Sequence, residues 1–139
     1  MITAKTEIAA EPEKVWAVLA DLAGYPSWNP FVTEASGDLT EGATLTLRMV
    51  VGDTTRTFTP TVLAVRPDEE LRWLGVLYSR RLFGGEHSFE LRPVDGGTEV
   101  VQSERFTGIL VPLLSNTLTK TERDFHAWNT ALKDRVESS

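Results

Sequence analysis

Residues 112–136 place one set of side chains at helical spacing, and this long stretch constrains the fold more than any other part of the chain. The set recurs at steps of three or four residues and comprises Leu114, Leu118, Thr121, Phe125, Trp128, Leu132 and Val136. Charged residues such as Lys120, Arg123 and Asp134 lie off this stripe. About 25 residues at about 1.5 Å each give a rod of roughly 38 Å, as long as a small domain is wide. Such a helix needs an apolar partner surface, which the rest of the chain must provide.

Most of the chain before this helix alternates apolar and polar residues with a period of two, which is typical of β-strands. Strands are predicted at residues 2–8, 32–39, 45–51, 55–66, 71–78 and 98–107, with a further one ending at residue 93. Pro60 predicts an edge position or a bulge in its strand. Short turns separate most of these strands, so we expect antiparallel pairing.

Two short helices are predicted near residues 12–30. Pro12 suits a first helical turn and Gly24 ends the first helix. Residues 25–31 combine two prolines with three aromatic residues, which predicts a rigid lid or wall. Together these elements predict an α+β fold, in which a curved antiparallel sheet of six or seven strands surrounds the C-terminal helix. A helix lying in a curved sheet need not fill it, so an internal hydrophobic cavity is expected.

Length and composition exclude several classes of function. A chain of 139 residues predicts a single domain, residues 1–139. A net charge of −6 argues against a nucleic-acid partner. The chain has no cysteine and only two histidines without ligand spacing, so we expect neither a metal site nor a cofactor. Neither a secretory pattern nor a run of about 18 apolar residues is present, which favours a cytoplasmic protein without a membrane span.

His87 and Glu104 are the candidate acid and base, and they lie on two predicted strands joined by a glycine-rich hairpin. A two-residue loop at residues 96–97 would pair Phe89 with Glu104 and His87 with Phe106. His87 would then lie diagonal to Glu104 and within side-chain reach. The two side chains project with Gln102 among apolar neighbours, where polar groups must bond to one another, to water or to a ligand.

Further side chains are candidates for lining a binding cavity. The aromatic ones are Trp28, Phe31, Trp73, Phe89, Phe106, Phe125 and Trp128, although aromatic residues at such spacings also form ordinary cores. Thr121 and Asn129 border the helix stripe and could orient an apolar ligand, or they could be rim residues in water.

Two segments near the C-terminal helix resemble a known superfamily. They are GEHSFELRP at residues 85–93 and GTEVVQSERFTG at residues 97–108, and they are followed by the long helix. With PEKVW at residues 12–16 and WNPF at residues 28–31, the chain resembles the SRPBCC superfamily (START and Bet v 1-like proteins), most closely its polyketide cyclase/dehydrase-like branch. The resemblance implies a helix-grip fold with a hydrophobic cavity. It implies no single activity, because members include cyclases, lipid carriers, hormone receptors and co-chaperones.

Three hypotheses on function follow. The first is binding of a small, largely apolar molecule, such as an aromatic, polyketide or lipid-like compound, between the sheet and the C-terminal helix. The second is a polyketide cyclase or dehydratase in which His87 and Glu104 serve as acid and base on an enolisable carbonyl. The third is a co-chaperone-like interaction module. The sequence leaves open whether the chain forms a homodimer, and His87 and Glu104 could also be structural.

Overall fold

The computed structural model describes residues 1–77, 79 and 81–138, and of residues 77 and 113–118 it describes the backbone only. Its elements in chain order are β1 (Ile2–Ile8), α1 (Pro12–Leu19), η1 (Leu22–Ser27), β2 (Val32–Ser36), β3 (Thr46–Val51), β4 (Thr54–Phe58), β5 (Thr61–Arg66), β6 (Glu70–Leu77), β7 (Phe83–Val94), β8 (Gly97–Thr107), η2 (Val111–Leu114) and α2 (Ser115–Glu137). Here η denotes a 3₁₀ helix.

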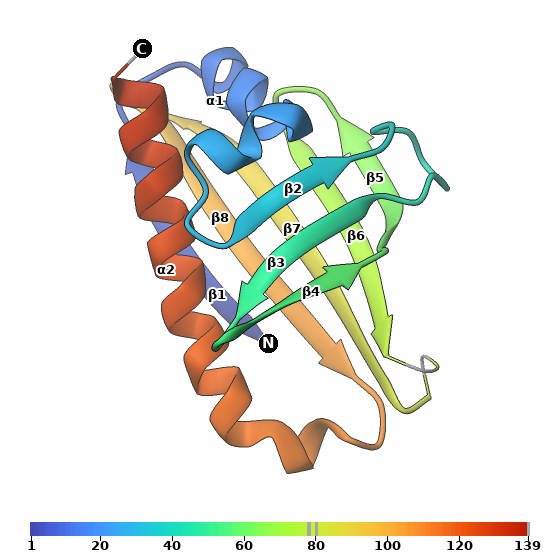
Figure 1. The fold of residues 1–139 in the computed structure, drawn as a ribbon. Coiled ribbons are helices and arrows are strands. Elements are labelled where there is room, and N and C mark those ends of the chain that lie inside the picture. The colour runs from blue at the N-terminus through green and yellow to red at the C-terminus, as the bar shows by residue number, and fades with distance from the viewer. Residues whose placement is uncertain (78, 80, 139) are drawn as a thin grey trace.

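The strands form two antiparallel sheets that α2 flanks (Figure 1). One sheet has five strands in the order β1-β8-β7-β6-β5, and the other has three in the order β2-β3-β4. Two contacts join the sheets. One is a β-bridge between Thr44 and Thr61. The other is a hydrogen bond of 2.9 Å that the Leu45 N–H donates to the Pro60 carbonyl. The small sheet crosses in front of the large one, which gives the curved wall that the sequence predicts (Figure 1). The predicted α+β, helix-grip architecture is confirmed.

The described residues contain eight strands rather than the six or seven predicted. The segment predicted as one strand at residues 55–66 is two strands, β4 and β5, which belong to different sheets. Pro60 lies between them; it has no N–H to donate, and its carbonyl accepts the hydrogen bond from Leu45 that joins the two sheets. The proline therefore marks the point where the chain changes sheets.

The predicted helices are present at both ends of the chain. The 3₁₀ helix η1 contains Pro26. Its Tyr25 is fully buried and donates a hydrogen bond of 2.6 Å to the Leu19 carbonyl at the end of α1. The predicted helix at residues 112–136 is α2 preceded by the short η2, which holds Pro112. The predicted stripe is buried at Phe125, Trp128, Leu132 and Val136 and half-buried at Thr121, whereas the side chains of Leu114 and Leu118 lie outside the described residues.

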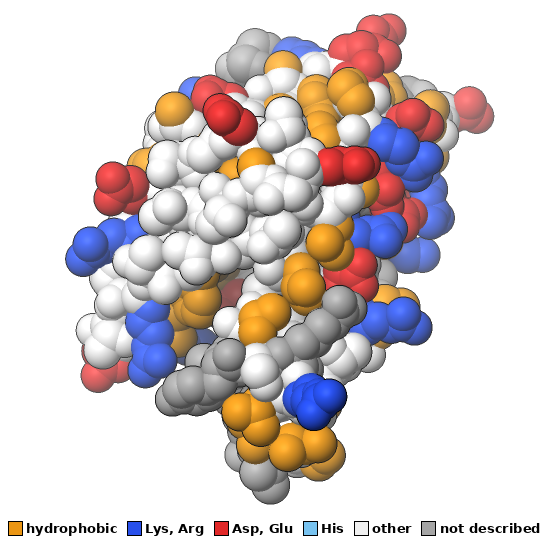
Figure 2. Space-filling view, turned by 90° about the vertical axis from the view of Figure 1, so that its right-hand side faces the viewer, with side chains coloured by type: hydrophobic (Ala, Val, Ile, Leu, Met, Phe, Trp, Pro, Cys, Tyr) orange, Lys and Arg blue, Asp and Glu red, His pale blue; other side chains and the backbone are white. Residues whose placement is uncertain are grey.

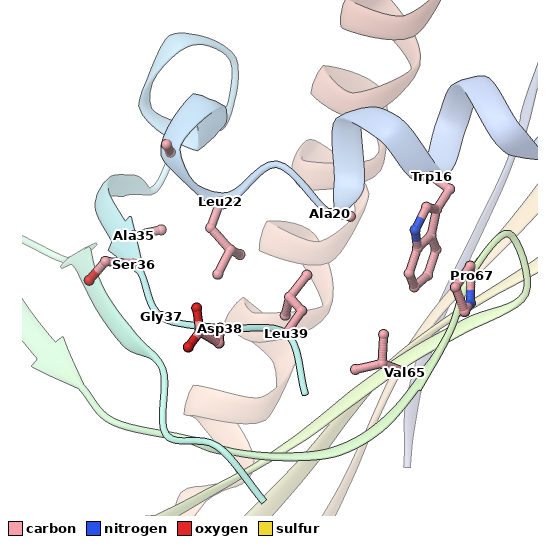
Figure 3. A pocket seen from close by; sticks show the side chains of 11 residues that line it. Trp16, Ala20, Leu22, Ala35, Ser36, Gly37, Asp38, Leu39, Val65 and Pro67 are labelled. Carbon is pink, nitrogen blue, oxygen red and sulfur yellow. The ribbon is translucent and has the colours of Figure 1, made fainter. Parts of the chain in front are cut away.

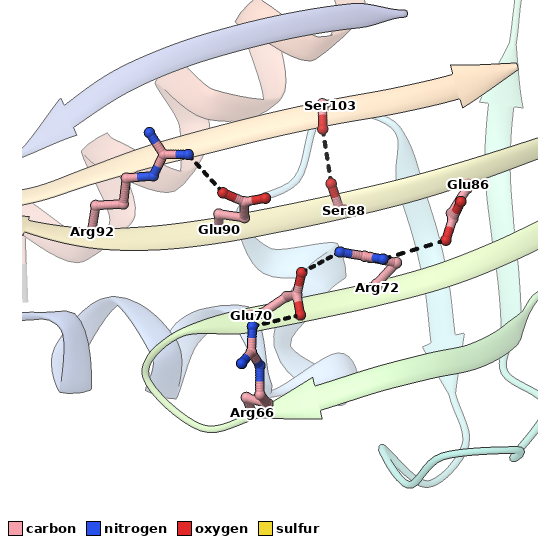
Figure 4. A network of polar contacts seen from close by, with 8 residues as sticks. All are labelled: Arg66, Glu70, Arg72, Glu86, Ser88, Glu90, Arg92 and Ser103. Atoms are coloured by element: carbon pink, nitrogen blue, oxygen red, sulfur yellow. Dashed lines mark hydrogen bonds and ion pairs between the residues drawn. The ribbon is translucent and has the colours of Figure 1, made fainter.

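The outer face of the large sheet carries an ion-pair network (Figure 4). The buried carboxylate of Glu70 accepts hydrogen bonds from both Arg66 and Arg72. Arg72 also reaches Glu86 at 3.5 Å on β7, so the network crosses from β6 to its neighbour. On the described part of the face near β5 and β6, acidic and basic side chains are interspersed without one large patch of either sign (Figure 2).

Candidate functional site

A cavity of about 320 Å³ lies between the two sheets and the middle of α2. Its lining comes from both sheets, from α2 and from the segment after η1: Phe31, Leu47, Met49, Val50, Val51, Phe58, Pro60, Trp73, Gly75, Phe83, Gly85, His87, Glu104, Phe106, Lys120, Thr121, Asp124, Phe125 and Trp128. The space beneath Phe125 and Trp128 is therefore not filled by the described side chains.

The cavity has an exposed end and a buried end. Val50, Val51 and Phe58 from the β3–β4 hairpin are exposed, as is Lys120 of α2. Trp73, His87, Phe125 and Trp128 are buried. A ligand entering beside the hairpin would thus leave water and meet a wall that is mainly aromatic.

His87 and Glu104 face each other directly across β7 and β8, and not diagonally as predicted. The register pairs Val94 with Gly97 and Phe89 with Gln102, because the two loop residues are Asp95 and Gly96. Gly96 has a φ of +82°, a conformation that glycine adopts without strain. The predicted register is wrong by two residues, so every side chain keeps its predicted face while its cross-strand partner changes.

The imidazole of His87 lies among aromatic rings. Its centroid is 4.8 Å from that of Phe125, 5.1 Å from that of Trp73 and 5.6 Å from that of Trp128. This apolar environment disfavours the charged ring, and burial lowers the pKa of His87 to about 4. His87 is therefore neutral at physiological pH.

Glu104 shares the same wall of the cavity. Its Oε1 lies 3.7 Å from Nδ1 of His87, which is beyond hydrogen-bond distance. Its side chain is 18% exposed, yet burial raises the pKa of Glu104 to about 7. The carboxyl group lies over Gly85, where an added Cβ would collide with Oε2. The absence of a side chain at Gly85 therefore leaves the space that the Glu104 carboxyl group occupies.

A chain of hydrogen bonds starting at a backbone carbonyl orients His87. The carbonyl of Ala4 can only accept, so the Asn129 side-chain nitrogen donates to it over 3.1 Å. Asn129 Oδ1 then accepts from Gln102 Nε2 over 2.8 Å, and Gln102 Oε1 faces His87 Nε2 at 3.2 Å. An amide oxygen accepts, so His87 Nε2 must carry the proton. In the neutral ring, Nδ1 is left as an acceptor on the side of Glu104.

The structure brings most of the predicted site residues together around one cavity. His87, Glu104, Phe31, Trp73, Phe106, Thr121, Phe125 and Trp128 line the cavity. Four predicted ligand-binding residues do not line it. Phe89 is buried in the core, Gln102 and Asn129 form the buried network behind His87, and the ring centroid of Trp28 lies 6.5 Å from that of Trp128 on the side of Tyr25.

Sequence reasoning missed the contribution of the β3–β4 hairpin to the cavity. Leu47, Met49, Val50, Val51 and Phe58 all line it. Val50 and Val51 are consecutive apolar residues at the end of a strand that otherwise alternates, and both are exposed. This break in the alternation was the available signal. Asp124, which also lines the cavity, lies off the helix stripe and gave no such signal.

A second hollow of about 540 Å³ lies at the other end of the small sheet (Figure 3). Trp16 of α1, Leu22 of η1 and Val65 of β5 point into it (Figure 3). It is larger than the cavity beside α2, but Ser36 and Asp38 on its wall are exposed, and Asp38 is the one charged residue in the described part of its lining. It therefore lacks the enclosed polar pair of the first cavity.

The described residues contain neither a metal-binding cluster nor a membrane-spanning helix. Among the described residues, no group of three or more histidine, cysteine, aspartate or glutamate side chains is placed to hold a metal ion. No helix in the described part of the chain is both long and apolar enough to span a membrane.

Comparisons with known proteins agree with this architecture. The sequence matches, over residues 1–137, the family described as polyketide cyclase / dehydrase and lipid transport. A search of curated proteins gives no match. The solved structure of TTHA0849 from Thermus thermophilus is similar, with 20% sequence identity and a TM-score of 0.76 over 99% of this chain and 97% of that one.

Two further solved structures are also similar to this chain. The Zhui aromatase/cyclase from Streptomyces sp. R1128 has 19% identity and a TM-score of 0.79 over 98% of this chain and 92% of its own. Ara h 8.0201 has 16% identity and a TM-score of 0.77 over 99% and 97% of the two chains. Identities this low establish the fold alone. The family match covers nearly the whole chain and confirms the SRPBCC resemblance: the chain belongs to the polyketide cyclase/dehydrase and lipid transport family.

Proposed function

We propose that residues 1–139 form a single ligand-binding domain, which takes a small and largely apolar molecule into the cavity between the sheets and α2. The observation that carries this proposal is the partly enclosed and mainly apolar space that has the polar side chains of His87 and Glu104 on its wall. Binding sites for small molecules typically combine an apolar lining with a few convergent polar groups. The buried indole N–H of Trp128, which has no hydrogen-bond partner among the described residues, adds a donor that a ligand could satisfy.

The volume of the cavity limits the size of the ligand. An apolar cavity of about 150 Å³ is large enough to bind benzene. The cavity of about 320 Å³ is roughly twice that size, so it suits a molecule of about two fused rings. A longer polyketide or lipid chain would have to extend past Val50 and Phe58 into solvent.

The polar pair supports enzymatic acid–base chemistry as a second candidate. Glu104, neutral below about pH 7, would protonate a carbonyl oxygen, and Nδ1 of His87 would take a proton from the adjacent carbon. A base whose pKa is about 4 removes protons from carbon poorly, because catalytic efficiency follows basicity. Because the low pKa of His87 makes it a weak base, we rank ligand binding ahead of acid–base catalysis as the proposed function.

Native mass spectrometry of protein purified from its own host, together with calorimetric titration of fused-ring aromatic compounds, tests the binding proposal. We expect a co-purified small molecule, or saturable binding at one site per chain. Absence of both would refute ligand binding, and an external surface would then have to carry the function, as in an interaction module.

Turnover of cyclisable polyketones tests the enzymatic candidate. Replacing either His87 or Glu104 by alanine should abolish turnover and leave affinity within about tenfold, because catalytic groups act mainly in the transition state. Turnover that survives in the double variant would remove both residues from the mechanism. The same substitutions in a carrier would change affinity alone.

A further inference from the structure

His87 and Glu104 on the wall of the cavity offer a ligand one hydrogen-bond acceptor and one hydrogen-bond donor when both side chains are neutral. Because Nε2 of His87 donates its proton to Gln102 Oε1, Nδ1 of the neutral ring is the acceptor. The Glu104 carboxyl group, protonated below about pH 7, is the donor. Lys120 and Asp124 of α2 are the other charged groups among the described lining residues, and Lys120 is exposed at the open end.

The spacing of these two groups suits one bridging oxygen atom. Nδ1 of His87 and Oε1 of Glu104 are 3.7 Å apart, which is too far for a direct hydrogen bond. A single oxygen can lie at about 2.8 Å from both atoms at once. To satisfy both, this oxygen must donate one proton to Nδ1 and accept one from the carboxyl group, and a neutral hydroxyl group does so.

We propose that the ligand carries a neutral hydroxyl group, as in a phenol or an enol, which binds between Nδ1 of His87 and the carboxyl group of Glu104. This inference rests on the proposed function and names the chemical class of the ligand. A carboxylate ligand is disfavoured at this point, because it has no proton for Nδ1 and would lie against Glu104 with no buried cation beside it among the described lining residues. Gln102 and Asn129 are positioning residues, since they set which nitrogen of His87 faces the ligand.

Three probes of similar shape test the proposal by calorimetric titration at pH 6: naphthalene, 2-naphthol and 2-naphthoate. One or two net hydrogen bonds should make 2-naphthol bind roughly tenfold more tightly than naphthalene. The ionised 2-naphthoate should bind most weakly. If none of the three binds, the proposed function fails together with this inference. Equal affinities for naphthalene and 2-naphthol, or tightest binding of 2-naphthoate, would overturn this inference alone.

Substitutions at Glu104 test which group makes the hydrogen bond. The preference for 2-naphthol over naphthalene should fall in Glu104→Ala, which keeps only the hydrogen bond to Nδ1 of His87, and it should persist in Glu104→Gln, whose amide remains a neutral donor. Arg105→Gln, on the exposed opposite face of β8, is the matched control and should keep the full preference. A preference as large in Glu104→Ala as in the parent chain would overturn the assignment.

The protonation of His87 can be read directly by ¹⁵N NMR of the imidazole rings. The chain has two histidines, so a His126→Gln variant identifies the signals of His87. We expect the neutral ring to be protonated at Nε2 with Nδ1 free of hydrogen at pH 6. A ring protonated at Nδ1 would overturn the proposal, because both groups facing the ligand would then be donors.

Discussion

Gly75 allows the cavity to be filled without disturbing its wall. A Cβ built at Gly75 meets only the Gly85 carbonyl oxygen, at 4.0 Å, among the described atoms, and Gly75 itself lines the cavity. Alanine or valine at this position should therefore fit. Glycine inside a strand costs roughly 0.5–1 kcal/mol relative to alanine, so we expect the free energy of unfolding to rise by about that amount.

The loss of ligand affinity should follow the number of carbon atoms that the substitution adds. Each buried carbon of a ligand contributes about 0.8 kcal/mol, so displacing one carbon by Gly75→Ala should weaken binding about fourfold. Gly75→Val adds three carbons, which corresponds to about 2.4 kcal/mol and roughly fiftyfold weaker binding. Isothermal titration with 2-naphthol measures both steps.

Two further variants make this test decisive. Ser36→Val adds one non-hydrogen atom to the wall of the other hollow (Figure 3), as Gly75→Ala does to the cavity, and it should leave affinity unchanged. Gly85→Ala should displace the flexible end of Glu104, and so reduce the preference for a hydroxyl group while the protein remains folded. If Gly75→Val is folded and binds as tightly as the parent chain, the ligand does not occupy this cavity and the reasoning is refuted.

Three predictions concern stability, each measured by urea denaturation. Burial raises the pKa of Glu104 from 4.5 to about 7, so the native state holds a proton that the unfolded state releases between those pH values. The free energy of unfolding of Glu104→Gln should thus equal that of the parent chain at pH 4 and exceed it by up to about 3 kcal/mol at pH 8. Equal free energies of unfolding at pH 8 would contradict this prediction. Asn129→Ala leaves the buried Gln102 Nε2 without its acceptor and removes the hydrogen bond to the Ala4 carbonyl, so it should cost roughly 2–4 kcal/mol; a cost below that of the half-buried control Ser103→Ala would contradict the network. Arg72→Ala should cost about 1.5–3 kcal/mol of stability. Arg66→Ala should cost under about 1 kcal/mol, because the side chain of Arg66 is 63% exposed. A larger cost for Arg66→Ala than for Arg72→Ala would contradict the ion-pair assignment.

Periodicity predicted which face each strand buries better than it predicted which residues are paired. The error in the β7–β8 hairpin came from two adjacent glycines with different roles. Gly96 forms the turn, whereas Gly97 lies where a side chain would collide with the backbone of Ile8. The close approach of β1 is a tertiary contact, so the local sequence could not distinguish the two. Because the error was an even number of residues, His87 and Glu104 remained on the predicted face.

The cavity itself was less predictable than its main walls. Phe89 and Trp73 share a face at neighbouring positions, yet Phe89 is enclosed by Trp73 and Trp128 while Trp73 reaches the cavity. Whether an inward side chain fills the core or borders a void depends on how far the β3–β4 hairpin is from α2. That distance is set by the packing of several elements, and a period of two residues carries no information about it.

The hydrogen bond between Asn129 and the Ala4 carbonyl joins residues separated by 125 positions. The group that orients His87 thus depends on the first strand and the last helix being in place together. During synthesis all eight described strands emerge before α2, so the apolar concave surface stays uncovered until the helix packs on it. The site is therefore assembled last, and deleting either β1 or α2 should abolish it even if much of the sheet survives.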